Sequence, residues 1–567
     1  MFFMRFLIFL ILFLANYSIG QDKYPKDYFR SPLDIPLSLA GSFGELRPNH
    51  FHSGIDFRTQ QKEGLPVYAS ADGFISRIRI STTGYGKSIY IDHPNGYTTV
   101  YGHLQRCAPD IQNVLNKEHY TKQNYEIEIR PKANEMPVKK GDLIAYSGNT
   151  GGSSGPHLHF EIRDTKSEFI INPLYFGLCD SLKDTKKPVL NSILAYPLDA
   201  NSQINGSANP VFLNLNLQKD GTYISNPITA SGKISFGINA YDLANNSYGK
   251  NGIFKMSSFA NGLPYFGYEF ETFSFDETKL INTFIDYSRY QSQKQRFQKL
   301  FVGYFYPQNI IKTKKNDGIL NVSSNLTTNY KIVLEDFNQN KTEVNIPVTY
   351  GVLPITQQKS EKVTPYFLKA LNEQSYTKDD ISVFIPEKTF YEDFYLDFDV
   401  KNNELFLHND SEAVNGNITI SFDVTKIPEN EREKMFIANL DGTRIEYNKT
   451  YKKENLFTIY TKKLGKFFLS KDEEAPRVYN PSFKDEDVLD DAKTFKIYIS
   501  DNLSGIKEYN AFLNDKWILM EYETKLNRLT HNFSDDIFIN GRNDFKLIVK
   551  DNMGNSTTFE SYFTKTK

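Results

Sequence analysis

Cysteine and tryptophan are scarce in this chain of 567 residues, which contains two cysteines and one tryptophan. Cys107 and Cys179 are too few for a disulfide-built scaffold, and their spacing does not fit a cysteine-based zinc site. In an oxidising compartment they could pair, and two unrelated free thiols are an equally good interpretation. Folding must therefore rest on hydrophobic cores, for which 40% hydrophobic and 14% aromatic residues provide enough apolar surface.

Neither sign of charge is in excess, since 66 Lys and Arg residues face 68 Asp and Glu residues, for a formal net charge of −2. A chain without a basic surplus has no electrostatic reason to bind nucleic acid, so we expect no nucleic-acid partner. The length predicts about three to five domains.

Long apolar runs are also missing beyond the first residues. The run FLIFLILFLA over 6–15 has ten residues, whereas a bilayer-spanning helix needs about 20. Arg5 precedes this run and the small residues Ser18 and Gly20 follow it, an order typical of a secretory signal peptide. We therefore predict a signal peptide over 1–20, with a short membrane anchor as the alternative. The mature chain is expected in the periplasm or outside the cell at the envelope, with no transmembrane segment after signal cleavage.

Tyrosine and phenylalanine are abundant, at 36 and 45 residues, and lie in runs of alternating polarity that favour strands over helices. A weak internal repeat appears in the C-terminal part: 234–242 resembles 495–501, and 330–336 with Asn340 resembles 545–551 with Asn555. Each copy is a strand that ends in Asp, followed by a turn and a return strand. We predict a mainly β fold with a first domain over 31–185, an immunoglobulin-like β-sandwich with a helix-compatible insertion at 276–301 over 188–352, a β-rich domain over 353–471, and an immunoglobulin-like β-sandwich over 472–567.

Histidines crowd into one part of the chain. Packing gives no reason for this, so chemistry is expected in the first domain. We assign a turn role to His93 and expect His119 to be solvated, because it lies in a charged excursion over 107–137. His50 is either a supporting residue of a site or a packing residue. The seven histidines between 50 and 159 are His50, His52, His93, His103, His119, His157 and His159.

The segment HLHFEI over 157–162 alternates polar and apolar residues. On a strand, a period of two puts His157 and His159 on one face and the apolar side chains on the other. Their Cα atoms would lie about 6.6 Å apart, and a Zn–N bond is about 2.1 Å long. One imidazole can then bind a metal while the other meets the metal-bound water. A polar strand face is the alternative for an isolated pair.

Two other segments add to this pair. HFHSGID over 50–56 supplies His52 and Asp56 four residues apart, with Gly54 between them, and YGHL over 101–104 supplies His103. Two histidines and one carboxylate form an established catalytic zinc set that leaves a fourth position for water. A loop with an ordinary aspartate is the alternative for the first segment.

Together, the three segments resemble the lysostaphin/LytM-type zinc endopeptidases, the twenty-third metallopeptidase family. The family signature is H-x-x-x-D, a lone His before Leu, and H-x-H followed by F-E, and the neighbouring GD (141–142), SGNTG (147–151) and GP (155–156) also match. The resemblance implies that His52, Asp56 and His159 bind one zinc ion per chain, and that His103 and His157 are the catalytic histidines beside the metal-bound water. It also implies a compact antiparallel β-sheet, the LytM or duplicated-hybrid-motif fold, with an open groove.

One departure from the family concerns the oxyanion. Some members carry a Tyr several residues before the first ligand, whereas GELRPN over 44–49 has none, and we hypothesise that Arg47 or a histidine takes this role. The chain has no H-E-x-x-H motif, so His103 and His157 are the available acid and base, with their division of roles open.

The function predicted from the resemblance is a secreted zinc metalloendopeptidase that hydrolyses cross-link or stem peptides of bacterial peptidoglycan. One alternative is a non-catalytic cell-wall binder or activator, whose β-sandwiches would contact a cell-envelope protein. Another is a peptidase acting on extracellular proteins.

Overall fold

The computed structural model describes residues 23–178, 182, 184–245, 249–323, 327–359, 362–535 and 537–566. The predicted signal peptide over 1–20 and Cys179 lie outside these residues, so the signal peptide stays a prediction. Cys107 is a buried free thiol, and burial raises its pKa to about 12. Within the described ranges, no helix has both the length and the apolar character that a membrane crossing requires.

An antiparallel sheet forms the centre of the first unit, with strand order β1-β4-β13-β8-β7-β6-β10. Alternation along these strands buries apolar side chains such as Phe57, Leu158 and Phe160 on one face. The helix α2 occupies much of the segment predicted as a surface excursion. The bounds are Leu39–Gly41 (β1), Ile55–Arg58 (β4), Gly73–Ile80 (β6), Lys87–Asp92 (β7), Tyr97–Leu104 (β8), Ile127–Ile129 (β10), His157–Asp164 (β13) and Pro109–Lys122 (α2), with a smaller sheet of Pro66–Tyr68 (β5), Leu143–Tyr146 (β12) and Arg106–Cys107 (β9).

The second unit is a larger sheet with the path β17-β15-β20-β28-β27-β21-β22-β25. The insertion predicted as helix-compatible over 276–301 contains three short helices. Two N-caps divide it: Ser274 makes a capping box with Glu277, and Asp286 accepts from Arg289 N. The bounds are Val189–Pro197 (β15), Val211–Phe212 (β17), Ile228–Tyr241 (β20), Lys255–Ala260 (β21), Leu263–Glu269 (β22), Ile311–Lys314 (β25), Thr328–Glu335 (β27), Lys341–Tyr350 (β28), Phe275–Thr278 (α3), Ile281–Phe284 (α4) and Tyr287–Gln293 (α5).

The first two units share one hydrophobic core. Strand β14 (Ile170–Ile171) of the first unit pairs with β23 (Thr272–Phe273) of the second. The ring of Phe51, next to His52, lies 5.4 Å from that of Phe270 and 5.5 Å from that of Phe284. The second unit therefore supports the segment that carries His52.

The third and fourth units each consist mainly of two sheets around a separate core. The mainly β fold is thereby confirmed, while the immunoglobulin-like identity stays a prediction. The third unit has the sheets β30-β31-β35-β39-β38 and β33-β34-β40-β36-β37, with bounds Gln374–Lys378 (β30), Ile381–Ile385 (β31), Phe398–Lys401 (β33), Glu404–Leu407 (β34), Ile418–Asp423 (β35), Met435–Asp441 (β36), Arg444–Tyr447 (β37), Tyr451–Lys453 (β38), Leu456–Thr461 (β39) and Gly465–Lys471 (β40). The fourth has β41-β42-β46-β45 and β44-β43-β47-β48, with bounds Arg477–Tyr479 (β41), Thr494–Ser500 (β42), Ile506–Leu513 (β43), Lys516–Ile518 (β44), Glu521–Glu523 (β45), Arg528–Asn532 (β46), Gly541–Asp551 (β47) and Ser556–Lys565 (β48).

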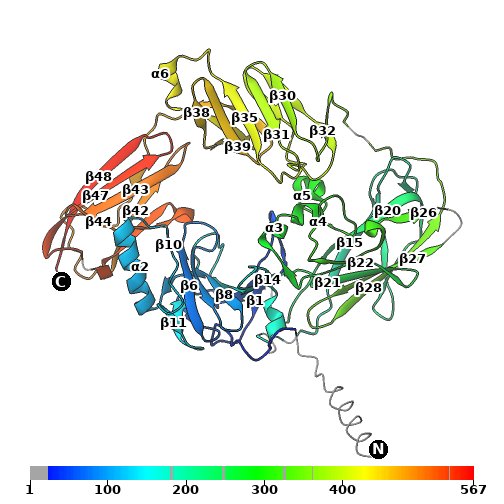
Figure 1. Cartoon of the computed structure of the whole chain (residues 1–567), viewed down its shortest axis with the longest axis horizontal. Helices are drawn as coiled ribbons and strands as arrows, with labels where there is room; N and C mark the ends of the chain where they lie inside the picture. The colour runs from blue at the N-terminus through cyan, green and yellow to red at the C-terminus, as the bar shows by residue number, and fades with distance from the viewer. Residues whose placement is uncertain are drawn as a thin grey trace, which may run out of the picture.

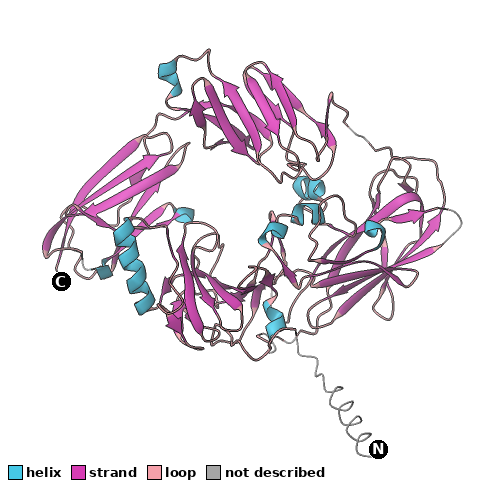
Figure 2. Ribbon diagram, in the orientation of Figure 1, coloured by secondary structure: helices cyan, strands magenta, loops and turns pink. Residues whose placement is uncertain are grey.

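The units follow one another around a ring, so that the fourth unit returns to the first (Figure 1). Figure 2 shows strands throughout the ring and α2 at the place where it closes. There Tyr120 of α2 packs edge-on against Trp517, with ring centroids 5.3 Å apart. Lys87 Nζ lies 2.8 Å from Glu521 Oε2. These contacts join residues that are some four hundred positions apart in the sequence.

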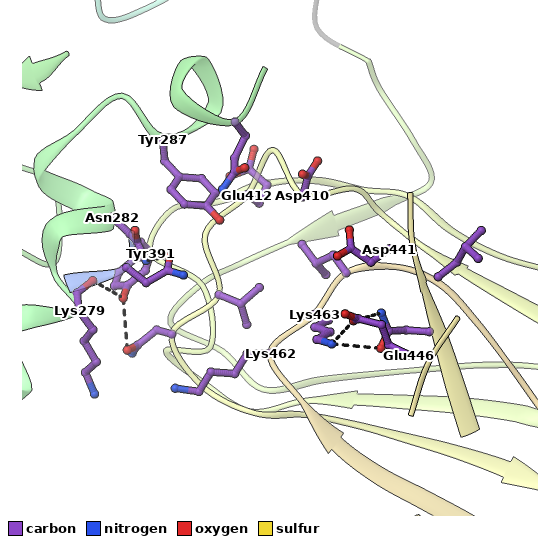
Figure 3. Close-up of a pocket in the computed structure, with 17 residues that line it drawn as sticks. Lys279, Asn282, Tyr287, Tyr391, Asp410, Glu412, Asp441, Glu446, Lys462 and Lys463 are labelled. Carbon is purple, nitrogen blue, oxygen red and sulfur yellow. Dashed lines mark hydrogen bonds and ion pairs between the residues drawn. The ribbon is translucent and has the colours of Figure 1, made fainter. Parts of the chain in front are cut away.

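A cavity of about 570 Å³ lies where the helical insertion of the second unit meets the third unit (Figure 3). Charged groups of both signs line it, and the predicted metal ligands do not. The charged lining residues are Lys279, Lys462, Lys463, Asp410, Glu412, Asp441 and Glu446.

Candidate metal centre

Strand pairing brings the predicted ligands together. In β13, His159 lies opposite Asp56 of β4 on one side and opposite Gly102 of β8 on the other. His157 and His159 share a face of β13, because side chains alternate along a strand. Gly102 leaves room for the imidazole, since a Cβ there would lie only 3.3 Å from the Cβ of His159. His52 stands three residues before the first residue of β4, in the segment supported by the second unit.

The three ligand atoms lie within hydrogen-bond distance of one another. His52 Nε2 is 3.1 Å from His159 Nδ1 and 3.2 Å from Asp56 Oδ1, and His159 Nδ1 is 3.0 Å from Asp56 Oδ1. Atoms bound to a tetrahedral zinc ion at about 2.1 Å are about 3.4 Å apart. One ion therefore fits between these atoms after small movements, and two nitrogens with one carboxylate oxygen are ligands that zinc favours.

Each histidine of this set is oriented through its other ring nitrogen. His52 Nδ1 lies 2.8 Å from the carbonyl oxygen of Ser42. A carbonyl only accepts, so Nδ1 carries the proton and Nε2 presents its lone pair to the cluster. His159 Nε2 lies 2.8 Å from Glu161 Oε1. A carboxylate behind a histidine ligand fixes the ring and increases its basicity.

Glu161 is fully buried and lies at the centre of a polar network. Ser53 donates to Oε1 at 2.6 Å and Tyr85 at 2.5 Å, while the guanidinium of Arg163 pairs with Oε2. The ring of Tyr85 is stacked on that of His159, with centroids 4.9 Å apart. Sequence reasoning missed the contact of Tyr85 with Glu161, because no spacing links residue 85 with residue 161.

The electrostatics of the cluster favour a bound cation. Burial lowers the pKa of His52 to about 4, so its imidazole is neutral near pH 7. Burial opposes ionisation of Asp56, but His52 and His159 outweigh it and hold the pKa of this carboxyl well below its usual range. Burial also opposes protonation of His159, yet hydrogen bonds with Asp56 and Glu161 raise its pKa to about 9. A cation at Nδ1 would take the place of that proton.

The remaining two histidines stand beside the ligands. The rings of His103 and His157 have centroids 4.7 Å apart. His103 Nδ1 lies 2.8 Å from Thr150 O, and His157 Nδ1 lies 2.8 Å from Gly155 O. His157 Nε2 is buried 3.5 Å from Asp56 Oδ1, and no hydrogen-bond partner for it exists among the described residues. A buried, unsatisfied nitrogen next to the ligands is what a site for a bound water would leave.

Residues 50–173 match the family model described as Peptidase family M23. These residues form a peptidase family M23 domain. The resemblance seen in the three motifs is thereby confirmed, and the family is one of metallopeptidases. A second family model, the Zu5-like domain, matches residues 365–472 and covers most of the third unit.

Curated relatives match about a quarter of the chain. A segment of 154 residues is 37% identical to an uncharacterized metalloprotease of Haemophilus influenzae and covers 26% of each chain. Another, of 152 residues, is 29% identical to the peptidoglycan DD-endopeptidase ShyA of Vibrio cholerae, covering 26% of this chain and 29% of that protein. The chain thus spans about a quarter of the length of these curated relatives. A solved catalytic domain of the M23 protein EnpA from Enterococcus faecalis is 25% identical, with a TM-score of 0.20 and coverage of 26% of this chain and 98% of that one.

Three other histidines of the M23 domain bind backbone or hydroxyl groups. His93 is buried between Asp72 O and Thr99 Oγ1, in keeping with a structural role. The expectation that His119 is solvated is wrong: it is 3% exposed, because α2 buries it against the domain, with Nδ1 2.9 Å from a backbone carbonyl. His50 is exposed and its Nδ1 lies 2.8 Å from Pro48 O.

Arg47 contacts the ligand set from the side. Its guanidinium lies 2.5 Å from Asp56 Oδ2 and 3.5 Å from Glu45 Oε2. This ion pair leaves Asp56 Oδ1 for the cluster. Stabilisation of an oxyanion by Arg47 stays a prediction, and the pairing with Asp56 gives this side chain a second role in holding a ligand.

A lysine of the fourth unit forms hydrogen bonds with the M23 domain loop over 148–155. Lys525 Nζ donates to Asn149 O at 2.6 Å and to Ser153 O at 2.7 Å. Ser153 Oγ in turn lies 3.2 Å from His157 Nδ1. The loop that orients His103 and His157 is therefore in direct contact with the other end of the chain.

Glu161→Gln is expected to weaken zinc binding by about 10- to 100-fold, because an amide supports the His159 ring less strongly than a carboxylate. The substitution keeps the shape of the side chain but leaves Arg163 without a charge partner. Competition with a chromogenic chelator measures the zinc affinity, and thermal melting reports stability separately. Glu168→Gln, at an exposed glutamate of the same domain, is the control. A Glu161→Gln chain that binds zinc as tightly as wild type would contradict the supporting role.

Proposed function

We propose that the M23 domain is a zinc endopeptidase that hydrolyses peptide bonds in bacterial peptidoglycan, in its cross-links or stem peptides. The observation that carries the proposal is the convergence of His52 Nε2, Asp56 Oδ1 and His159 Nδ1 beside the unsatisfied His157 Nε2. The similarity to a relative named peptidoglycan DD-endopeptidase supports the choice of substrate. Peptidoglycan lies outside the cytoplasmic membrane, so the proposal includes export, in agreement with the predicted signal peptide.

His52, Asp56 and His159 would hold one zinc ion. When bound, zinc supplies a Lewis acid and lowers the pKa of a water to about 7. The chain itself supplies the proton transfers. His103 and His157 each keep a proton on Nδ1, because that nitrogen faces a backbone carbonyl. Each therefore has an Nε2 lone pair that can accept a proton from the attacking water or, once protonated, return it to the leaving amine.

Burial keeps both histidines neutral. It lowers the pKa of His103 to about 3 and also lowers the pKa of His157, so both imidazoles are neutral near pH 7. The carbonyls of Thr150 and Gly155 keep the rings from turning. The two histidines are equivalent in these respects, and the proposal leaves open which one acts as base.

Digestion of purified peptidoglycan by the zinc-loaded full chain tests the proposal. We expect mass spectrometry to find muropeptides in which a peptide bond has gained one water, and chelation followed by addition of zinc to remove and restore this product. The position of the new amine identifies the bond. Unchanged muropeptides with a zinc-loaded chain would overturn the proposal, and cleavage of casein alone would favour a peptidase of extracellular proteins.

A further inference from the structure

Two clusters of three aspartates occupy equivalent positions in the second and fourth units. The proximal aspartate cluster is Asp184, Asp242 and Asp336, and the distal aspartate cluster is Asp472, Asp501 and Asp551. In each cluster, one carboxylate oxygen from each residue lies within 4.8 Å of the others. The second and third aspartates of each cluster stand at the ends of the strands that resemble each other in the sequence, β20 and β27 in the second unit and β42 and β47 in the fourth.

The first aspartate is held in the same way in both clusters. Asp184 Oδ1 accepts the backbone N–H groups of residues 186 and 245 at 3.0 and 3.1 Å. The carboxylate of Asp472 accepts those of residues 474 and 504 at 3.2 and 3.0 Å. In both units, one donor stands two residues after the first aspartate of the cluster in chain order, and the other donor stands three residues after the second aspartate. The first aspartate lies in the connection that leads into the unit, so it ties that connection to a strand end.

The third aspartate also has the same partners twice. Asn340 Nδ2 donates to Asp336 Oδ2 at 2.7 Å and to the carbonyl of the first aspartate at 3.0 Å. Asn555 Nδ2 donates to Asp551 Oδ2 at 2.7 Å and to the corresponding carbonyl at 3.1 Å. The two clusters are thus one structural device built twice.

In and beside both clusters, buried oxygen atoms have no hydrogen-bond partner among the described residues. Asp242 is 7% exposed, and no described residue makes a hydrogen bond to its Oδ1. Asn251 is 5% exposed, and its backbone N–H and C=O groups both bond to those of Asp242. The two side chains therefore lie on the same side of the strand pair. Asn251 Oδ1 is also without a hydrogen-bond partner in the described part of the chain. In the distal cluster the same holds for Asp501 Oδ1 and for Oγ of Ser504, which is 3% exposed. Buried oxygens without hydrogen-bond donors are groups that a bound cation would stabilise.

The charge of the clusters agrees with this. Burial, then the carboxylates of Asp336 and Asp184, raises the pKa of Asp242 to about 7. Burial also raises the pKa of Asp501, and the charges of Asp472 and Asp551 add to the rise. Carboxylates forced together in this way are stabilised by a divalent cation that binds all three.

We propose that each aspartate cluster binds one Ca²⁺ ion, which fixes the connection into its unit. The donors are all oxygens, with no histidine or cysteine in either set, so a hard cation is favoured over zinc. Three carboxylates with side-chain oxygens of Asn251 or Ser504 provide the large, irregular oxygen shell that Ca²⁺ accepts, whereas Mg²⁺ requires near-octahedral geometry and keeps its waters.

The ions would act at joints of the ring. Asp184 lies between the M23 domain and β15, and Asp472 lies between β40 of the third unit and β41 of the fourth. A bound ion at each place would couple the connecting segment to two strand ends of the following unit. The inference does not depend on the proposed peptidase activity, since neither cluster includes a residue of the zinc site.

Calcium titration of the full chain tests the inference. The chain is stripped with a chelator, reloaded with one equivalent of zinc, and titrated with CaCl₂ in a calorimeter. We expect two Ca²⁺ ions per chain, with a dissociation constant on the order of 10⁻⁴ M, the range of extracellular calcium modules. The melting temperature should rise with Ca²⁺ and less with the same concentration of Mg²⁺. The His159→Ala chain should give the same two Ca²⁺ ions, which separates these sites from the zinc site.

Asp242→Asn and Asp501→Asn distinguish the clusters. Each should reduce the stoichiometry to one ion, and the double variant should bind none. Without calcium these chains should melt no lower than wild type, because the substitution removes a repelling buried charge; this keeps a loss of calcium binding distinct from misfolding. Asp220→Asn and Asp485→Asn, at exposed aspartates of the same units that also accept backbone N–H groups, are the controls and should keep two ions.

Four results would overturn the inference, and the fourth concerns Mg²⁺. The first is the absence of calcium binding by wild type at a hundred times the expected dissociation constant. The second is two bound ions in Asp242→Asn and Asp501→Asn. The third is equal loss in the control variants. An equal response to Mg²⁺ would exclude the assignment to calcium.

Discussion

Replacing His159 by alanine is expected to abolish both zinc binding and peptide hydrolysis. His159 Nδ1 is one of the three converging ligand atoms, and its ring joins the cluster to Glu161 on the other side. Two remaining ligands, His52 and Asp56, cannot hold zinc at the affinity of a three-ligand site. Activity should fall below about 1% of wild type, because the water then keeps a pKa far above neutrality.

Zinc per chain, measured by elemental analysis after dialysis, and release of muropeptides are the two measurements. His50→Ala is the matched control, since His50 is an exposed histidine of the same domain and bonds only to a neighbouring carbonyl in the described structure. It should keep both zinc and activity. A His159→Ala chain that retains one zinc ion and full activity would remove the centre assigned to His52, Asp56 and His159.

Replacing His103 by glutamine should separate metal binding from catalysis. His103 bonds to Thr150 O and is not among the converging ligand atoms. Zinc content should therefore stay at one ion per chain, while kcat falls by about 10²- to 10⁴-fold, the usual contribution of a general acid or base. His157→Gln should behave alike, and the double variant should lose less than the product of the two effects, because the histidines act in one reaction.

The readouts are kcat on a soluble muropeptide, zinc content and melting temperature. Loss of zinc in His103→Gln would show that this residue is a ligand rather than a catalytic group. An unchanged kcat in both single variants would contradict the assignment of proton transfer to these histidines.

Local periodicity predicted the strand that carries His157 and His159, with both rings on one face. The resemblance to a known family, rather than periodicity, named His52 and Asp56 as the other candidate ligands. Both features depend on a few neighbouring residues. The different environments of the two β13 histidines follow from the same register, because His159 alone faces Asp56.

Contacts between distant segments could not be predicted in this way. Tyr85 supports Glu161 from another hairpin, and Lys525 reaches the loop of His157 from the opposite end of the chain. His119 was misjudged because its charged neighbours indicate solvent, while the packing of α2 against the sheet decides its burial. The sequence repeat did indicate where the strands of the second and fourth units end in Asp, but not that a third aspartate from the preceding connection joins them.

Closure of the ring limits how the four units can vary in size. The chain leaves the M23 domain near residue 185 and must return to it at Lys525. Lys525 therefore contacts Asn149 only if the second and third units together bridge the distance between these two points. An insertion at a joint, for example in 473–476, would withdraw the ammonium from two carbonyls of the loop that orients His157. The positions of His103 and His157 are therefore linked to the dimensions of units that contribute no residue to the candidate metal centre.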